Sequence, residues 1–265
     1  MDQPPPIPPT LSAIPPEWEE RRQHAWEKIE NHVPRELRSG RFLDIGCGVG
    51  NAIVAALQHG FTGAIGIDRN LSEFPWFKPA RFDDICRASG VPPGGAVLIE
   101  ADIFDLAFPE SSFDCVLMLD SIEHMPDPAK FLSYAARVVR PGGIVLVDSS
   151  PLYYGRSGHH LFSYFPPETF PWAHLRHDFA RLVERLKVDA WSMQRFHELN
   201  HVTHQEVRIA MEQVGLEIIE EERGRPTDEL EALLSLHRPH LALEGIAEKL
   251  LFEEWLLLVG RKRPV

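Results

Sequence analysis

The 265-residue chain is poor in cysteine, with Cys47, Cys86 and Cys115 as its three members. They are far apart and odd in number, so the sequence offers neither a CxxC metal motif nor a disulfide framework. The proline-rich opening has no basic segment followed by an apolar one, as a secretory signal peptide would. These absences predict a cytoplasmic protein whose cysteines are small buried side chains.

Positive charge is also scarce, because 27 Lys and Arg stand against 39 Asp and Glu, a net charge of −12. An acidic surface repels phosphate backbones, so we expect no nucleic-acid partner. No apolar run approaches the roughly 20 residues that span a bilayer, so we also expect no membrane span. A hydrophobic content of 44% is ordinary for a globular protein, and the length suits one large α/β domain.

What the sequence does have is an alternation of apolar, strand-like runs with helical patterns. Strands are predicted at residues 41–46, 63–68, 96–102, 113–120, 144–150, 216–222 and 254–262. Helices are predicted from residue 17, and at residues 51–60, 77–89, 127–138 and 203–214, and a helical excursion is predicted over residues 228–250. Strands that are apolar on both faces and alternate with helices predict a mostly parallel sheet covered by helices on both sides.

Two segments depart from this alternation. Residues 1–16 are rich in proline, and we expect a disordered tail before one domain at residues 17–265. Residues 151–202, called the insertion below, are rich in aromatic side chains, histidine and proline. A long insertion of this composition after a strand predicts a helical and aromatic lid or substrate pocket. Thr203 and Glu206 have the spacing of a capping box, which predicts the start of the next helix.

The sharpest local motif is LDIGCGVG at residues 43–50, where a strand turns into a helix. Gly46, Gly48 and Gly50 allow a tight turn whose backbone can approach a ligand closely. A dinucleotide site is the competing interpretation, but its G-x-G-x-x-G/A pattern is broken by Asn51. Asp44 directly before the turn would disfavour a pyrophosphate and favour a cationic ligand.

Two more acids follow predicted strands. Asp68 could accept hydrogen bonds from a ribose diol, and Asp102 could accept one from an adenine amine while Ile103 packs on the ring. Open α/β sheets bind ligands at the carboxyl ends of their strands. Together with Asp44, these acids therefore predict one ligand-binding edge.

Five motifs in this order resemble those of class I S-adenosylmethionine-dependent methyltransferases of the small-molecule, ubiquinone-methyltransferase-like type. They are FLDIGCGVG, GIDRN, EADIFDLAF, FDCVLMLDSIEHM and RPGGIVLVDSS. The resemblance covers residues 40–150, and residues 203–262 resemble the reversed final strand pair of that family. It implies a Rossmann-like, seven-stranded, mostly parallel sheet, with S-adenosylmethionine (SAM) as cofactor and S-adenosylhomocysteine as product. It also implies the cofactor-binding residues, namely Asp44, Gly46, Cys47, Gly48 and Gly50 for the methionyl part, Asp68 and Arg69 for the ribose, Asp102 and Ile103 for the adenine, and Asp120 and Ser121 beside the methyl group.

The segment from Asp120 to His124 resembles the E-x-x-E-H pattern that is thought to bind a divalent metal in ubiquinone-pathway O-methyltransferases. Here the first acid is Asp, and the alternative is that Glu123 and His124 only shape a pocket. We therefore expect no metal, and Asp120, Glu123 and His124 are the candidate ligands if one binds. His124 could instead act as a general base.

The family resemblance implies that the loop after residue 150 lines the acceptor pocket. Tyr153 and Tyr154 could stack on a planar acceptor, and His159 or His160 could take a proton from an attacking hydroxyl. Packing within a lid is the alternative role for all four.

Residues 197–201 read HELNH, which matches the H-E-x-x-H signature of zinc proteases. That site needs His197 and His201 on one unbroken helix, whereas the capping box at Thr203 predicts a connection over residues 200–202. We expect His197, Asn200 and His201 to contact substrate from the insertion instead.

The sequence thus predicts a methyltransferase for a small-molecule acceptor that is apolar or aromatic in part. Oxygen is the preferred acceptor atom over nitrogen or carbon, because several histidines could serve as the base. A non-catalytic SAM-binding module, a dinucleotide oxidoreductase and a zinc hydrolase are the alternatives. The sequence determines neither the acceptor nor the oligomeric state.

Overall fold

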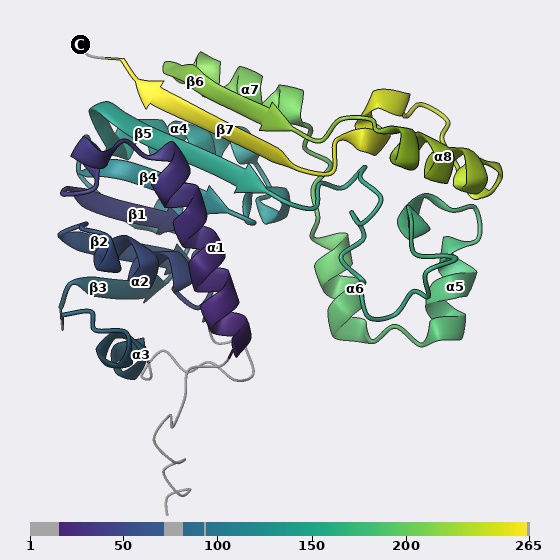
Figure 1. Cartoon of the computed structure of the whole chain (residues 1–265), viewed down its shortest axis with the longest axis horizontal. Coiled ribbons are helices and arrows are strands. Elements are labelled where there is room, and N and C mark those ends of the chain that lie inside the picture. Colours follow the sequence, from purple (N-terminus) through teal and green to yellow (C-terminus); the bar gives the residue numbers. More distant parts are fainter. Residues whose placement is uncertain (1–15, 72–81, 93, 264–265) are drawn as a thin grey trace, which may run out of the picture. The chain divides into compact units, whose positions relative to one another are not determined.

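The computed structural model describes residues 16–71, 82–92 and 94–263. It divides into two compact units, residues 1–107 (unit 1) and residues 108–265 (unit 2). The seven strands form one sheet in the order β3-β2-β1-β4-β5-β7-β6 (Figure 1). The predicted Rossmann-like, seven-stranded, mostly parallel sheet is therefore confirmed. The predicted tail lies outside the described residues, except for Pro16, which begins a helix.

Unit 1 is a run of parallel strands joined by helices, because a parallel connection must cross back over the sheet. Its strands pair in register, with Leu43 opposite Ile65 and Ile65 opposite Val97. Its elements are α1 (Pro16–His32), β1 (Arg41–Ile45), α2 (Asn51–Gln58), β2 (Gly63–Asp68), α3 (Phe82–Ala88) and β3 (Ala96–Glu100), with 3-10 turns η1 (Arg35–Leu37) and η4 (Ile103–Asp105). The start of the helix predicted at 77–89 lies outside the described residues.

Helix α1 packs against α2, which in turn packs against the three strands of unit 1. Trp18, Trp26 and Ile29 recur on one side of α1 and are all buried. Because these apolar residues lie three to eight positions apart, they form one helical stripe. The amphipathic pattern of residues 17–32 thus decides which side of α1 faces the core of unit 1.

Unit 2 begins with β4 (Phe113–Leu119), α4 (Pro128–Val138) and β5 (Val139–Ser149), with the turn η5 (Ile122–His124) after β4. The Asp127 carboxylate accepts a hydrogen bond from the amide of Lys130 at the start of α4, where Pro128 occupies the first turn. Such a cap satisfies an amide that has no partner within the helix. The predicted start of this helix is confirmed.

The carboxyl-terminal elements of unit 2 are α7 (His204–Gln213), β6 (Leu216–Arg223), α8 (Asp228–His237), η7 (Arg238–His240), η8 (Glu248–Phe252) and β7 (Leu256–Lys262). The capping box of Thr203 and Glu206 is present as predicted. Strand β7 is antiparallel to both β5 and β6, so β6 runs with β5. The expected final strand pair is therefore present, with β7 reversed and inserted between β5 and β6.

Strand β5 begins earlier than predicted. It pairs Val139 with Phe113, and the register then shifts so that Ile144 pairs with Cys115. The Pro-Gly-Gly segment at 141–143 was expected to precede the strand, but it forms an irregularity within it, with Gly142 at φ 76°. The extra residues are taken up as a bulge, which a glycine accommodates at little cost.

The insertion contains η6 (Ala173–Leu175), α5 (Phe179–Leu186) and α6 (Ala190–His197), and has an apolar core of its own. The buried members of that core are Leu161, Phe165, Ala173, Leu182, Phe196 and Leu199. A second apolar cluster joins the insertion to α8 and η8 through Trp172, Leu175, Leu234, Leu241, Leu251 and Phe252. The aromatic composition of the insertion is thus explained largely by packing within unit 2.

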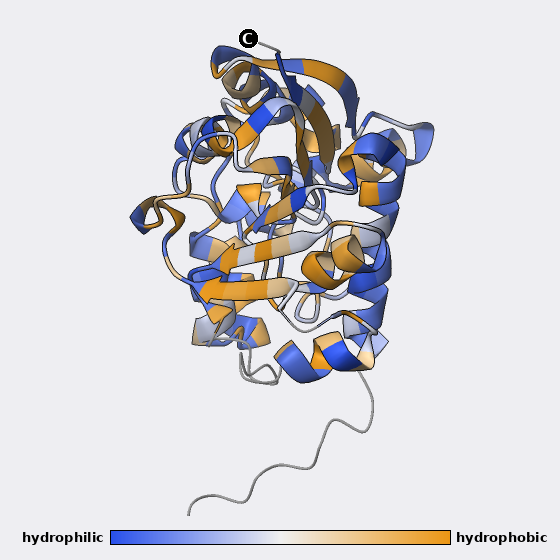
Figure 2. Ribbon diagram, turned by 90° about the vertical axis from the view of Figure 1, so that its left-hand side faces the viewer, coloured by the Kyte–Doolittle hydropathy of each residue, from blue (hydrophilic) through white to orange (hydrophobic). Residues whose placement is uncertain are grey.

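Hydropathy follows this arrangement. Figure 2 shows several strands that are largely hydrophobic, whereas the helices alternate between hydrophobic and hydrophilic residues; β6, with the sequence LEIIEEER, is mainly charged. Among the described residues, no helix combines the length and the apolar character that crossing a membrane requires.

Candidate functional site

The glycine-rich turn of unit 1 follows β1 directly and has a backbone that other residues rarely adopt. Gly46, Gly48 and Gly50 have φ values of 80°, 49° and 82°. These lie in the left-handed region, which glycine enters without a steric penalty. The amides of Gly46 and Cys47 both donate to the carbonyl of Ile67, at 2.8 and 3.1 Å, and so fasten the turn to the end of β2.

The Asp68 carboxylate at the end of β2 holds the same turn from its other side. Its Oδ2 accepts a hydrogen bond from the amide of Gly48 and its Oδ1 one from the amide of Asn70, both at 2.9 Å. The side chain is only half-buried. Each carboxylate oxygen has a second lone pair, so Asp68 can still accept hydrogen bonds from ligand hydroxyls. Its predicted contact with a ribose remains a prediction that this geometry permits.

Asp44 is the most unusual group of unit 1. It is 3% exposed, and its Oδ1 has no hydrogen-bond partner among the described residues. Burial, and then the charge of Asp68, raise the pKa of Asp44 to about 8. A buried carboxyl oxygen without a partner is costly. A ligand that brings an ammonium or N–H group would supply the missing bond.

The remaining cofactor candidates of unit 1 have plainer surroundings. Asp102 accepts a hydrogen bond from the amide of Phe104 at 3.0 Å and so caps η4, while Ile103 is buried. Arg69 is exposed. Burial raises the pKa of the Cys47 thiol well above its usual value, which makes it an unreactive packing residue. The adenine-binding roles of Asp102 and Ile103 stay predictions.

Trp18 is a contributor that the sequence motifs did not reveal. It is 1% exposed, and its indole donates to the carbonyl of Val49 at 3.5 Å. Its own carbonyl accepts from the side chain of Asn51 at 2.8 Å. Residue 18 therefore supports the glycine-rich turn and the first residue of α2. The helical spacing of tryptophan predicted its burial, but nothing local predicted these two partners.

In unit 2, the turn after β4 begins with a strained residue. Asp120 has φ 46°, its amide donates to the carbonyl of Asp148 at 2.9 Å, and its Oδ1 accepts from the amide of Ser150 at 3.1 Å. A non-glycine residue in this region costs on the order of 1–3 kcal/mol and is often found at functional sites. Ser121 beside it is buried. Their predicted contacts with the cofactor remain predictions.

Glu123 and His124 follow in η5, and the pKa values of both side chains are shifted from their usual values. Glu123 is 1% exposed, and its Oε2 accepts a hydrogen bond from the Ser149 hydroxyl at 2.6 Å. Burial raises the pKa of Glu123 to about 8, against the opposing effect of Ser149. Burial, then the charge of His160, lower the pKa of His124 to about 3. His124 is therefore a neutral imidazole at neutral pH.

Asn200 holds this turn in place. Its side-chain amide donates to the carbonyls of Ile122 and Met125, both at 2.7 Å, and its backbone amide donates to the carbonyl of Glu123 at 2.8 Å. Its Oδ1 accepts from the amide of Val202 at 2.9 Å. These contacts disfavour the predicted substrate contact, because both the donors and the acceptor of Asn200 are engaged by backbone. Asn200 is therefore a positioning residue for this turn.

The two histidines of the loop after β5 differ. His159 is fully buried, its Nε2 lies 3.1 Å from the carbonyl of Phe170, and its Nδ1 accepts from the amide of Leu161 at 3.0 Å. These contacts disfavour the predicted role of His159 as a base, since neither nitrogen is available to a substrate. His160 is partly exposed and its Nε2 lies 3.0 Å from the carbonyl of Pro151. That bond leaves the other nitrogen of His160 for a ligand.

The HELNH segment does not form the helix that a zinc protease requires. Helix α6 ends at His197, and His201 lies in the connection before α7. Both histidines are exposed. The ring of His201 stacks on Tyr153 with centroids 3.7 Å apart, and Tyr154 lies edge-on at 5.9 Å. The structure thus gathers Tyr153, Tyr154 and His201, whereas a contact of any of them with substrate remains a prediction.

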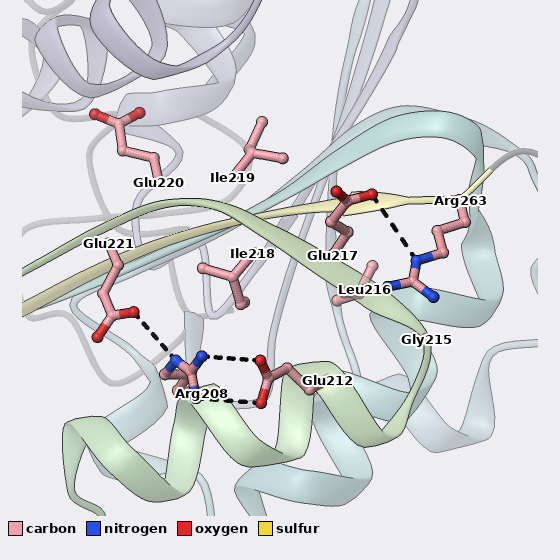
Figure 3. A pocket seen from close by; sticks show the side chains of 10 residues that line it. All are labelled: Arg208, Glu212, Gly215, Leu216, Glu217, Ile218, Ile219, Glu220, Glu221 and Arg263. Atoms are coloured by element: carbon pink, nitrogen blue, oxygen red, sulfur yellow. Dashed lines mark hydrogen bonds and ion pairs between the residues drawn. The ribbon is translucent and has the colours of Figure 1, made fainter.

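A hollow of about 420 Å³ lies elsewhere in unit 2, between α7 and β6 (Figure 3). Arg208 forms ion pairs with Glu212 and Glu221, and Arg263 lies 3.8 Å from Glu217. Its charged side chains are therefore largely paired with one another. It contains none of the residues predicted to bind cofactor or substrate.

Comparison with known proteins agrees with this architecture. Residues 18–221 match the family of the methyltransferase domain. The 27-O-demethylrifamycin SV methyltransferase of Amycolatopsis mediterranei (strain S699) is 36% identical over 127 residues, 47% of this chain and 43% of that protein. The ubiquinone biosynthesis O-methyltransferase of Rhizobium etli (strain CIAT 652) is 36% identical over 117 residues, 43% of this chain and 42% of that protein. The matched region thus spans less than half the length of these curated relatives.

Solved structures share the fold at lower identity. An S-adenosylmethionine-dependent methyltransferase from Mesorhizobium loti superposes with a TM-score of 0.54 at 21% identity, over 89% of this chain and 97% of that one. The [4+2]-cyclase SpnF superposes with a TM-score of 0.56 at 16% identity, over 93% of this chain and 83% of that one. The fold alone therefore does not fix the reaction.

Proposed function

Because the chain belongs to the class I S-adenosylmethionine-dependent methyltransferases, a family whose cofactor is SAM, we propose that it methylates an oxygen atom of a small-molecule acceptor. The observation that supports this most directly is the buried Asp44 oxygen without a partner beside the glycine-rich turn. An acidic group there suits a cofactor that carries an ammonium group. With a pKa of about 8 the carboxyl is largely protonated at neutral pH, and a bound ammonium group would favour its ionised form.

The described residues of unit 1 fit SAM by their chemistry. Asp44 would accept a hydrogen bond from the ammonium group, Gly46 and Gly48 give backbone access to the methionyl part, and Asp68 would accept hydrogen bonds from the ribose hydroxyls. The buried Ile103 is suited to an adenine ring, with Asp102 nearby. SAM supplies an activated methyl group, so the protein's tasks are to position the reactants and to exclude water.

The proposal of an oxygen acceptor is supported by side chains of unit 2 and by the names of relatives. Rifamycin and ubiquinone biosynthesis O-methyltransferases are among the relatives, as is a tocopherol O-methyltransferase of Arabidopsis thaliana, 31% identical over 42% of this chain and 30% of that protein. Tyr153, Tyr154 and His201 would stack on a planar acceptor. An attacking hydroxyl must lose a proton, and the ring nitrogen of His160 that Pro151 does not engage could accept it. The pKa of about 3 makes His124 a much weaker base.

A second candidate is a protein that binds SAM without methyl transfer. The fold similarity to a cyclase supports keeping this alternative. It differs from the proposed function in one observable, since the cofactor would bind and no acceptor would gain a methyl group.

Calorimetric titration of the full chain with S-adenosylhomocysteine tests the cofactor, with NADH as the negative control. We expect micromolar binding of the first and none of the second. No binding of S-adenosylhomocysteine would refute the proposal. A panel of phenols and hydroquinones with SAM then tests the reaction by mass spectrometry of the methylated products. Cofactor binding without turnover across that panel would favour the non-catalytic alternative.

A further inference from the structure

Three potential metal ligands lie together in unit 2. They are Glu123 and His124 of η5 and His160 of the insertion, and one ligand atom from each lies within 4.8 Å of the others. The Glu123 Oε1 is 4.0 Å from the His124 Nε2, and the two imidazole rings meet edge to face with centroids 5.2 Å apart. Two imidazoles and one carboxylate form a donor set that suits zinc and other divalent transition metals.

The hydrogen bonds around these side chains leave suitable atoms free to bind a metal. Pro151 offers a carbonyl oxygen to the His160 Nε2 at 3.0 Å, and a carbonyl can only accept. The Nε2 must therefore carry the proton, and the lone pair of His160 is on Nδ1. The Ser149 hydroxyl donates to the Glu123 Oε2 and leaves Oε1 toward His124. Partners of this kind orient metal ligands in many proteins.

The backbone of both contributing segments is also fixed. His160 has φ 55°, in the left-handed region that few residues other than glycine adopt, although histidine, asparagine and aspartate are found there more often than other types. The turn that carries Glu123 and His124 is held through three hydrogen bonds from Asn200. The backbone of His160 and the hydrogen bonds of Asn200 thus hold both contributing segments in defined conformations, as expected for a preformed site.

We propose that Glu123, His124 and His160 bind one divalent transition-metal ion such as Zn²⁺. Metal–ligand bonds of about 2.1 Å place ligand atoms roughly 3–3.5 Å apart, so the side chains need to close by about 1 Å. Three protein ligands leave a coordination position for water or another ligand. The set differs from the one suggested by the sequence, because Asp120 is replaced by His160 from the insertion. The proposal goes beyond methyl transfer and does not depend on it. With the metal bound, the lone pairs of His124 and His160 are occupied, so neither histidine would then serve as the base.

The test uses the full chain, freed of metal by a chelator and titrated with Co²⁺ as a spectroscopic substitute for Zn²⁺. We expect one equivalent to produce the visible absorption of a tetrahedral or five-coordinate site. Calorimetry with Zn²⁺ gives the affinity. The variant His160→Asn removes the imidazole but places at this position a residue type that tolerates φ 55°. The variant Glu123→Gln removes the charge and keeps the shape of the side chain. Each should weaken binding by more than 100-fold, and Ser149→Ala by about 10–100-fold.

The double variant His197→Ala/His201→Ala is the matched control, because it removes the two exposed histidines of the HELNH segment. It should bind Co²⁺ as tightly as the wild type. The proposal is overturned if the wild type binds no metal, if His160→Asn binds it unchanged, or if the double variant abolishes the absorption. Circular dichroism confirms that each variant is folded. Since S-adenosylhomocysteine binding is measured separately, a failure here leaves the proposed function standing.

Discussion

The glycine-rich region of unit 1 and the insertion of unit 2 bury polar side chains in opposite ways. Asp44 lies in a short, regular part of the sheet and has an oxygen without a partner. In the insertion, His159, His160 and His174 each have a ring nitrogen within hydrogen-bond distance of a backbone carbonyl. The first region leaves a carboxyl oxygen for a ligand, whereas the second satisfies most of its polar atoms internally, with the Nδ1 of His174 as an exception.

This difference shows which sequence features give reliable information about a binding site. A carboxyl that the protein itself does not satisfy points to a missing ligand, because burial without a partner is costly. His159 was predicted to act as a base, yet it is buried beside Phe170, and the neighbouring His174 is likewise buried beside Tyr153. Residue type alone therefore says less about function in the insertion than in the glycine-rich turn.

The largest expected effect is on cofactor binding by unit 1. We expect Asp68→Ala to weaken S-adenosylhomocysteine binding by at least about 100-fold, because it removes a charged acceptor for the ribose and loosens the amide of Gly48. Calorimetry measures the change. Asp105→Ala, an exposed acid of η4, is the control and should bind as the wild type does. Equal affinities for Asp68→Ala and the wild type would contradict the assignment.

Removal of a polar side chain in the insertion should lower the stability of the fold and not the affinity for the cofactor. Asn200→Ala removes two side-chain hydrogen bonds to the turn of Glu123 and the one that Asn200 accepts from the amide of Val202. The backbone bond to Glu123 remains, and we expect the free energy of unfolding to fall by about 2–4 kcal/mol. Urea unfolding measures it. Replacement of the exposed His197 by Ala should change it by less than about 0.5 kcal/mol. If Asn200→Ala were as stable as the wild type, the positioning role would be wrong.

Asp44→Asn should raise stability while it weakens cofactor binding. The Asp44 carboxyl has a raised pKa of about 8 in the fold. Its unfolded pKa is about 3.9, so folding takes up a proton between these values and stability falls as pH rises. We expect the variant to gain about 1–3 kcal/mol over the wild type at pH 8, and less at pH 5. Urea unfolding at both pH values measures it, and a pH-independent difference would refute the explanation.

His174 should give the opposite pH dependence. Burial, then the charge of His159, lower the pKa of His174 to about 3 in the fold. The unfolded imidazole titrates near 6.5, so the unfolded chain binds the extra proton below that value. Stability should therefore fall as pH drops below 6.5, by at most about 1.4 kcal/mol per unit. His174→Gln should flatten this dependence in urea unfolding between pH 5 and 7; an unchanged slope would exclude His174 as its source.

The smallest effect is expected at the surface of the insertion. His201 is exposed and stacks on Tyr153, so His201→Ala should lower stability by less than about 1 kcal/mol. Cofactor binding should be unchanged. If His201 contacts the acceptor, the KM for that acceptor should rise in steady-state kinetics. A KM equal to that of the wild type would leave His201 with a packing role.

Most of the strands and the principal helices could be predicted, because their signals are local. Apolar runs and the caps at Asp127 and Thr203 gave positions close to the observed ones. The start of β5 was missed, since the Pro-Gly-Gly segment is typical of a turn and only pairing with β4 draws it into a strand. The two clusters of the insertion were also beyond prediction, because their members are scattered along the chain.

By itself, the sequence determined the glycine-rich turn, the acids that follow the strands and the family to which the chain belongs. These features depend on neighbours within a few residues, where backbone preference and side-chain type are decisive. Tertiary structure alone decided that Asn200 supports a turn 75 or more residues away, that Ser149 reaches Glu123 over 26 residues, and that His160 joins His124. Such pairs form only when the rest of the fold has brought distant segments together, and no local pattern records them.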